Sequence, residues 1–163
     1  YKLTAHLTIS GISILQTVGA AVALVYFIGV PTEVSFTLAG GLASLTALLV
    51  GCILYQMMLA CLELTAFWFE NVWSLGVMLR FISEFFGGAM VPLAFFPLWA
   101  KEILQWTPIP GFFAIPIDLA LGRLPAIALF PHLVLMSAWG LVAAGCVSFV
   151  WRKGLREYTG VGA

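Results

Sequence analysis

The sequence predicts an all-α, polytopic membrane protein with four transmembrane helices and a short re-entrant or interfacial helical pair between the last two. Hydrophobic residues make up 63% of the 163-residue chain and charged residues only 9%, whereas a soluble domain has about 45–50% apolar and about 25% charged residues. So few charges cannot cover the surface of a chain of this length. Backbone groups inside lipid must be satisfied internally, and no alternating apolar–polar pattern indicates a barrel, so the spans are expected to be helices.

The first predicted span is residues 8–30, which contain no charged side chain. At about 1.5 Å per residue this run reaches roughly 34 Å, which is enough to cross a hydrocarbon core of about 30 Å with some tilt. Residues 31–35, PTEVS, are predicted to form a turn. In this turn Pro31 ends one helix, and Thr32 or Ser35 can cap the next.

The second span is predicted over residues 36–60. The apolar run continues to residue 69, interrupted by Glu63, and its aromatic and acidic end is typical of a helix that leaves the lipid through the headgroups. Small residues recur every four positions along one face, where they favour close helix packing: Ala39, Ala43, Ala47 and Gly51. Gly40 and Ser44 widen this stripe, which packs either within the chain or against a second transmembrane chain.

The third span, residues 74–96, carries both charges and helix-disrupting residues. Arg80 and Glu84 lie one turn apart on one helix face, so they can partly neutralise each other. They form either a pair that snorkels to the inner headgroups or a polar element that faces a transport path or a partner chain. Three residues weaken the helix where it bends into the next segment: Gly87, Gly88 and Pro92.

Residues 97–129 form the predicted pair of short helices. The apolar residues of the first helix share one face, which is typical of an amphipathic helix in the membrane interface: Trp99, Ile103 and Trp106. The second helix is expected to end near Gly122 and Pro125. The pair either dips back toward the membrane or is an interfacial anchor with no role in transport.

The fourth span, residues 130–151, is followed by the basic tail 152–163. Gly140 and Ala144, together with Ser148, form a second face of small residues that favours helix packing. Four spans place both termini on one side of the membrane. The basic residues of that side, above all those in the tail, predict that it is the cytoplasmic side.

No residue pattern indicates catalysis or metal binding. The two histidines, His6 and His132, lie at span edges and on opposite sides of the membrane in this layout, so they cannot share a metal. The sequence contains no HExxH or GxSxG motif, no paired-carboxylate motif and no Gly-rich phosphate loop. The net charge of zero, without a long basic run, gives no nucleic-acid face. We therefore expect no catalytic, cofactor-binding or metal-binding residues and no nucleic-acid partner.

Three motifs occur in order along the chain. The Phe67-Trp68 pair precedes the third span, the stretch GAMVP at 88–92 ends it, and the chain closes with Gly154-Leu155-Arg156 and then Tyr158 to Gly162. In the order and spacing of these motifs the whole chain resembles the membrane subunits of type-2 ABC exporters, the ABC-2 permeases, in an uncharacterised bacterial branch.

This resemblance implies a permease subunit of an ATP-driven exporter in the bacterial inner membrane, with both termini of this chain cytoplasmic. It implies six spans, of which this chain would hold the last four and lack the two N-terminal ones. The implied partners are cytoplasmic ABC ATPase subunits, which would bind ATP and magnesium, and a second permease chain in a homodimer or heterodimer. An amphipathic or lipid-like substrate would pass between the two permease chains, near Arg80 and Glu84. The alternative is a structural or assembly subunit of a membrane complex that transports nothing.

Overall fold

The computed structural model describes Tyr26 and residues 34–157. The predicted first span at 8–30 therefore lies, except for Tyr26, outside the described residues. The chain divides into two units, Tyr1–Val34 and Ser35–Ala163. All the helices described below belong to the second unit, in which the described residues contain helices and turns and no strand.

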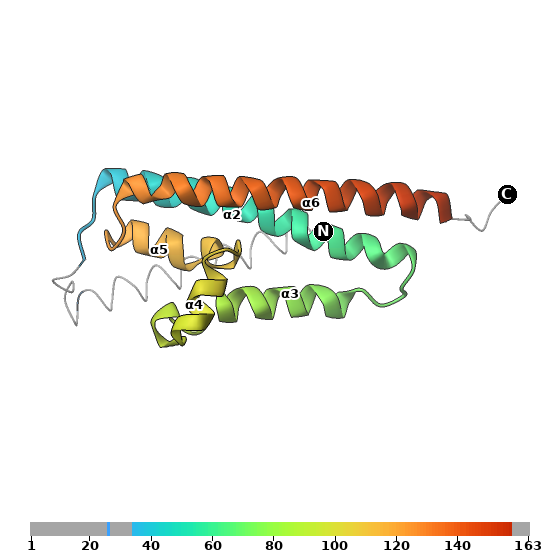
Figure 1. The fold of residues 1–163 in the computed structure, drawn as a ribbon, viewed down its shortest axis with the longest axis horizontal. Coiled ribbons are helices and arrows are strands. Elements are labelled where there is room, and N and C mark those ends of the chain that lie inside the picture. Colours follow the sequence, from blue (N-terminus) through green and yellow to red (C-terminus); the bar gives the residue numbers. More distant parts are fainter. Residues whose placement is uncertain (1–25, 27–33, 158–163) are drawn as a thin grey trace. The chain divides into compact units, whose positions relative to one another are not determined.

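Two long helices, α2 (Leu38–Glu63) and α6 (Leu129–Glu157), run side by side in the same direction (Figure 1). The hydroxyl of Thr37 begins α2 as an N-cap, since its Oγ1 accepts the Gly40 N–H at 3.0 Å. The 3-10 turn η1 (Leu64–Phe67) then prolongs α2. By length and composition, Leu38–Phe67 and Ala126–Arg156 are the two helices of the described part that can cross a membrane. Both extend beyond the predicted spans, and residues 152–157 of the predicted tail continue α6.

The helix observed in the third predicted span is shorter than the span itself. Helix α3 (Trp73–Phe86) has 14 residues, or about 21 Å, and ends ten residues before the predicted end at 96. Gly88 has φ of +92°, and the Ala89 N–H donates to the Glu84 carbonyl at 3.1 Å, which together make a glycine-based helix cap. The break therefore begins at the Gly-Gly pair, before Pro92 can act on the helix.

Two short helices lie in the segment predicted to hold a pair of them. They are α4 (Leu98–Leu104) and α5 (Ala114–Ala120), and they are accompanied by three 3-10 turns: η2 (Leu93–Phe95), η3 (Ile109–Phe112) and η4 (Ala126–Ala128). Helix α5 ends at a second left-handed glycine, Gly122, with φ of +71°. The predicted stop near Gly122 is thereby confirmed.

Helix α4 turns its predicted apolar face away from the other helices. Its buried residues are Ala100 and Leu104, whereas the predicted stripe is exposed: Trp99, Ile103 and Trp106. Exposed aromatic residues on a short helix are typical of contact with lipid at the membrane interface.

The core lies around α2, in two clusters of buried residues. The first joins Leu54 of α2 to Phe112 of η3 and Met136 of α6. The second joins Ala43 and Ala47 of α2 to Leu119 of α5. Helix α3 runs antiparallel along the second half of α2, as Figure 1 shows.

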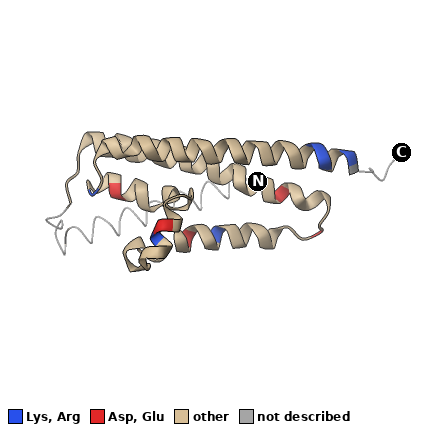
Figure 2. Cartoon of the chain, in the orientation of Figure 1, with Lys and Arg blue, Asp and Glu red and all other residues tan. Residues whose placement is uncertain are grey.

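The outer faces of the two long helices are apolar. Leu45, Leu49 and Ile53 are exposed on α2, and Leu141 and Phe149 are exposed on α6. Figure 2 shows that most of both helices carries no charge, and that basic side chains gather at the C-terminal end of α6. An exposed apolar surface of this extent fits a helix surrounded by lipid.

Candidate functional site

A cleft of about 420 Å³ lies between α2, α3 and the turn η3. Its lining combines apolar walls with the charged and polar side chains of two helices: Leu48, Gly51, Cys52, Tyr55, Gln56, Arg80, Ser83, Glu84, Phe112 and Phe113. This volume is within the range of about 300–1,000 Å³ that is usual for ligand pockets.

The predicted ion pair forms one side of this cleft. The Nε of Arg80 donates to Oε1 of Glu84 at 2.7 Å, one turn apart on α3. The Arg80 side chain is 73% exposed and the Glu84 side chain 29% exposed. Both side chains line the cleft, and the carboxylate is the less exposed of the two.

Ser83 is the most unusual polar residue of the cleft. The residue is 1% exposed, and its Oγ has no hydrogen-bond partner. A helical serine commonly donates to the carbonyl four residues before it, which here would be that of Leu79, but it does not do so. A buried hydroxyl without a partner costs about 1–3 kcal/mol of stability, so the folded chain on its own leaves Ser83 unsatisfied.

The cleft lies level with the middle of α2. The continuous helix runs from Leu38 to Phe67, and the α2 residues that line the cleft fall between Leu48 and Gln56. Gly76 of α3 faces Leu59, nearer the end of α2. The Arg80–Glu84 pair is therefore beside the midpoint of the long helix and not beside its end.

The three predicted helix-disrupting residues lie where α3 meets the outer segment. Gly87 is buried, and its carbonyl accepts the Ala114 N–H at 3.0 Å. A methyl group at Gly87 would meet the Ser83 carbonyl oxygen and, at 2.9 Å, the Phe113 ring. Gly88 supplies the left-handed turn, and Pro92 immediately precedes the turn η2. These residues bring the end of α3 into backbone contact with the start of α5.

The small residues of α2 mostly pack within the chain. Ala43 and Ala47 are buried against Leu119, and a methyl group at Gly51 would lie 3.2 Å from the Gly111 carbonyl. Ala39 is exposed, and its neighbour Gly40 is buried instead.

The small residues of α6 are placed differently. A methyl group at Gly140 would meet no atom within 4 Å. Ala144 is half-buried and lines a shallow groove with Cys52 and Gln56 of α2. The predicted α6 stripe is therefore not a buried contact in the part of the chain that the structure describes.

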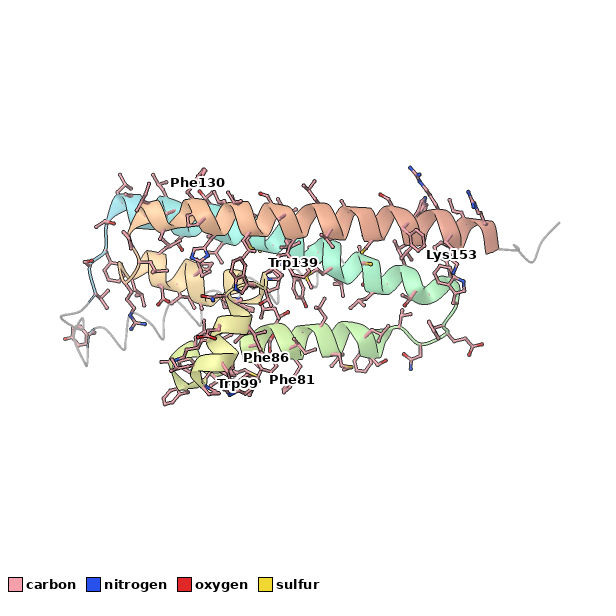
Figure 3. The ribbon with its side chains drawn as sticks, in the orientation of Figure 1. Phe81, Phe86, Trp99, Phe130, Trp139 and Lys153 are labelled. Atoms are coloured by element: carbon pink, nitrogen blue, oxygen red, sulfur yellow. The ribbon has the colours of Figure 1, made fainter. Side chains whose placement is uncertain are left out.

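A second, smaller cavity of about 190 Å³ lies beneath α4. Its polar residues include Lys101, Gln105 and His132. Trp139 of α6, which is labelled in Figure 3, donates its indole N–H to the carbonyl of Trp106 at 2.9 Å. Among the residues that the structure describes, no group of three or more His, Cys, Asp or Glu side chains could hold a metal, and His6 lies outside them.

Sequence reasoning found the ion pair but missed three polar neighbours. Ser83 looks like an ordinary helical serine, and Tyr55 and Gln56 lie in an apolar run on another helix. Only the packing of α3 against α2 brings these side chains together. Helical spacing could have pointed to Ser83. It is adjacent to Glu84 and three residues after Arg80, so it lies on the same side of α3 as the ion pair.

Comparisons with known proteins place the chain in a family. Searches of the curated proteins and of the solved structures found no match. A family model described as "ABC-2 family transporter protein" matches residues 3–162, which include the cleft and all the helices described above. The chain therefore belongs to the ABC-2 family of transporter proteins and is a membrane permease of the ABC transporter type.

Proposed function

We propose that this chain is a permease subunit of an ATP-driven exporter and forms half of a substrate path between two permease chains. Its family membership supports the permease role. In this proposal the chain is not an enzyme, and cytoplasmic ABC ATPase subunits bind ATP and magnesium. The partner permease is a second copy or a related chain, and the complex lies in the bacterial inner membrane.

The proposed layout has four crossings, the first at residues 8–30 and the others in the described part. The second and fourth crossings are α2 and α6. The third is composite: α3 follows the second half of α2, and α5 continues from there to the start of α2, where Ser35 N–H donates to the Leu121 carbonyl at 3.2 Å. Non-helical backbone at membrane depth is tolerated where protein buries it, and Gly87 and Gly111 at the junction are both buried.

The placement of Arg80 is the observation that carries the proposal. A charge at the bilayer centre costs at least about 2.5–3.5 kcal/mol, and Arg80 lies beside the midpoint of α2 with most of its side chain exposed. In the proposed layout the midpoint of α2 lies near the bilayer centre, so Arg80 lies deep in the membrane. This favours a path or a partner chain over the snorkelling pair as the surroundings of Arg80.

Thiol accessibility tests whether this face of α3 meets water. Val77 is 45% exposed and one turn before Arg80, so Val77→Cys leaves the ion pair intact. In a background with the native cysteines replaced by serine, a charged, water-soluble methanethiosulfonate should modify Val77→Cys in native membranes. Leu49→Cys is the control, because Leu49 is 67% exposed on the apolar face of α2. Equal protection of both thiols would contradict a path along α3.

Purification from native membranes tests the proposed partners. A tagged chain in mild detergent should bring down a nucleotide-hydrolysing subunit and a second permease chain. A complex without an ATPase would instead favour the structural or assembly role.

A further inference from the structure

We propose that the α2–α3 cleft binds the uncharged, hydroxyl-bearing headgroup of an amphipathic molecule, and that the Ser83 hydroxyl holds this headgroup. The proposal rests on the permease function above, and it names the chemistry that the site recognises. Three properties of the cleft carry it: an unsatisfied hydroxyl, an internally balanced charge and an apolar wall.

Ser83 provides a hydrogen-bonding group without a partner in the protein. Ser83 is one of the residues that line the cleft, and its Oγ is covered by the protein and makes no hydrogen bond, so the ligand displaces a neighbouring side chain to reach it. A hydroxyl can donate one hydrogen bond and accept two. A ligand hydroxyl can serve as acceptor and donor at once, so it satisfies this group whichever way the serine rotates.

The charges of the cleft favour an uncharged headgroup. Arg80 and Glu84 neutralise each other at 2.7 Å, and these are the two charged residues in the lining. Because the pair has no net charge, it gives a charged headgroup no net attraction to offset the hydration that is lost on entering an apolar cleft.

The ion pair can still bind neutral hydroxyls. In the part of the chain that the structure describes, the two terminal nitrogens of Arg80 and the second carboxylate oxygen of Glu84 make no hydrogen bond. They remain as donors and acceptors for a polyol, and Gln56 of α2 adds a carboxamide that can do both.

The remaining walls suit the apolar part of the ligand. Leu48, Phe112 and Phe113 line the cleft, and the ring of Phe112 is fixed edge-on against Tyr55 at 5.8 Å. The exposed Val77 and Phe81 continue an apolar surface on α3 beside Arg80. An alkyl chain can follow this surface while its headgroup lies at Ser83.

Photolabelling with three matched probes tests the headgroup class. The full chain is placed in phosphatidylcholine nanodiscs with dodecyl probes that carry the same diazirine and end in glycerol, phosphate or trimethylammonium. The glycerol probe should label the peptides that contain residues 48–56 and 112–113 more strongly than the other two. Equal labelling by all three probes, or preference for a charged one, would overturn the proposal.

Substitutions at Ser83 test its role. Ser83→Ala should reduce labelling by the glycerol probe about tenfold, the effect of one lost hydrogen bond of about 1.4 kcal/mol. Ser74→Ala is the matched control, since Ser74 is exposed at the other end of α3, and it should label as the unmodified chain does. Undiminished labelling of Ser83→Ala would remove Ser83 from the site.

Two charge variants test whether the balanced ion pair selects an uncharged headgroup. Each variant should increase labelling by one of the charged probes. Glu84→Gln leaves an unpaired guanidinium and should raise labelling by the phosphate probe. Arg80→Gln leaves an unpaired carboxylate and should raise labelling by the ammonium probe. If neither variant increases labelling by its charged probe, the balanced pair does not select the headgroup, and this part of the proposal is wrong. These experiments contain no ATPase, so their failure would overturn the ligand class while Val77→Cys modification still reports on the path.

Discussion

Single glycines determine how closely the helices of this chain approach. At Gly154 of α6, an added methyl group would clash with the ring of Phe67. At Gly140 of the same helix it would meet no atom within 4 Å. Two glycines with the same backbone conformation therefore have opposite structural roles, and the sequence does not distinguish them.

The pair Gly154→Ala and Gly140→Ala tests this difference. Gly154→Ala should destabilise the chain by about 1–3 kcal/mol, because the Phe67 ring has to move. Gly140→Ala should be neutral or stabilising by up to about 1 kcal/mol, because alanine favours the helix more than glycine does. Thermal unfolding in detergent, followed by tryptophan fluorescence, would measure both, and a lower midpoint for Gly140→Ala would show that a contact covers it.

The site residues show how far sequence reasoning reaches at this scale. Arg80 and Glu84 stand out because charges are rare in an apolar run, and Gly88 and Gly122 stand out as helix ends; these glycines have positive φ in the structure. Ser83 could not be identified, because its lack of a partner depends on which groups α2 and η3 bring near it.

At the scale of elements, hydrophobic length predicted α2 and α6 well and α3 less well. A run of about 20 apolar residues signals a crossing, but the third run contains a Gly-Gly pair that ends α3 at Phe86. Apolar composition does not tell whether the residues after such a break continue across or fold back. Here they turn into η2 and α4 before α5 returns along α2.

The parallel packing of α2 and α6 predicts a specific cross-link. Cys61 of α2 and Cys146 of α6 lie close to each other, and both thiols are free. In a Cys52→Ser background, dibromobimane should join them within one chain and become fluorescent. Cys61→Ser or Cys146→Ser should abolish the signal. Fluorescence only between chains, visible as a dimer on denaturing gels, would contradict this packing.

At the scale of the whole molecule, the proposed composite third crossing predicts which segments face each side of the membrane. Helix α4 lies in the same half of the described unit as the starts of α2 and α6, and η1 and the end of α6 lie at the opposite end (Figure 1). The basic residues Arg152, Lys153 and Arg156 lie at the second end, which predicts that this end is cytoplasmic.

Single-cysteine labelling tests this orientation. In a cysteine-free background, Glu102→Cys on α4 should react with an impermeant maleimide added to intact cells, since Glu102 is exposed. Leu155→Cys, exposed at the end of α6, should react only after the cells are opened. The reverse pattern would invert the layout and with it the proposed position of the ATPase.

The contact between η1 and the end of α6 has a mechanical consequence. Phe67 occupies the space that Gly154 leaves, Trp151 packs edge-on against Phe67 at 5.9 Å, and the Lys153 ammonium lies 5.7 Å from the centre of the Trp68 ring (Figure 3). Because the Phe67 ring packs against Gly154 and Trp151 of α6, α2 and α6 cannot slide along each other unless this ring leaves its position. A force applied at this end should therefore move both helices together.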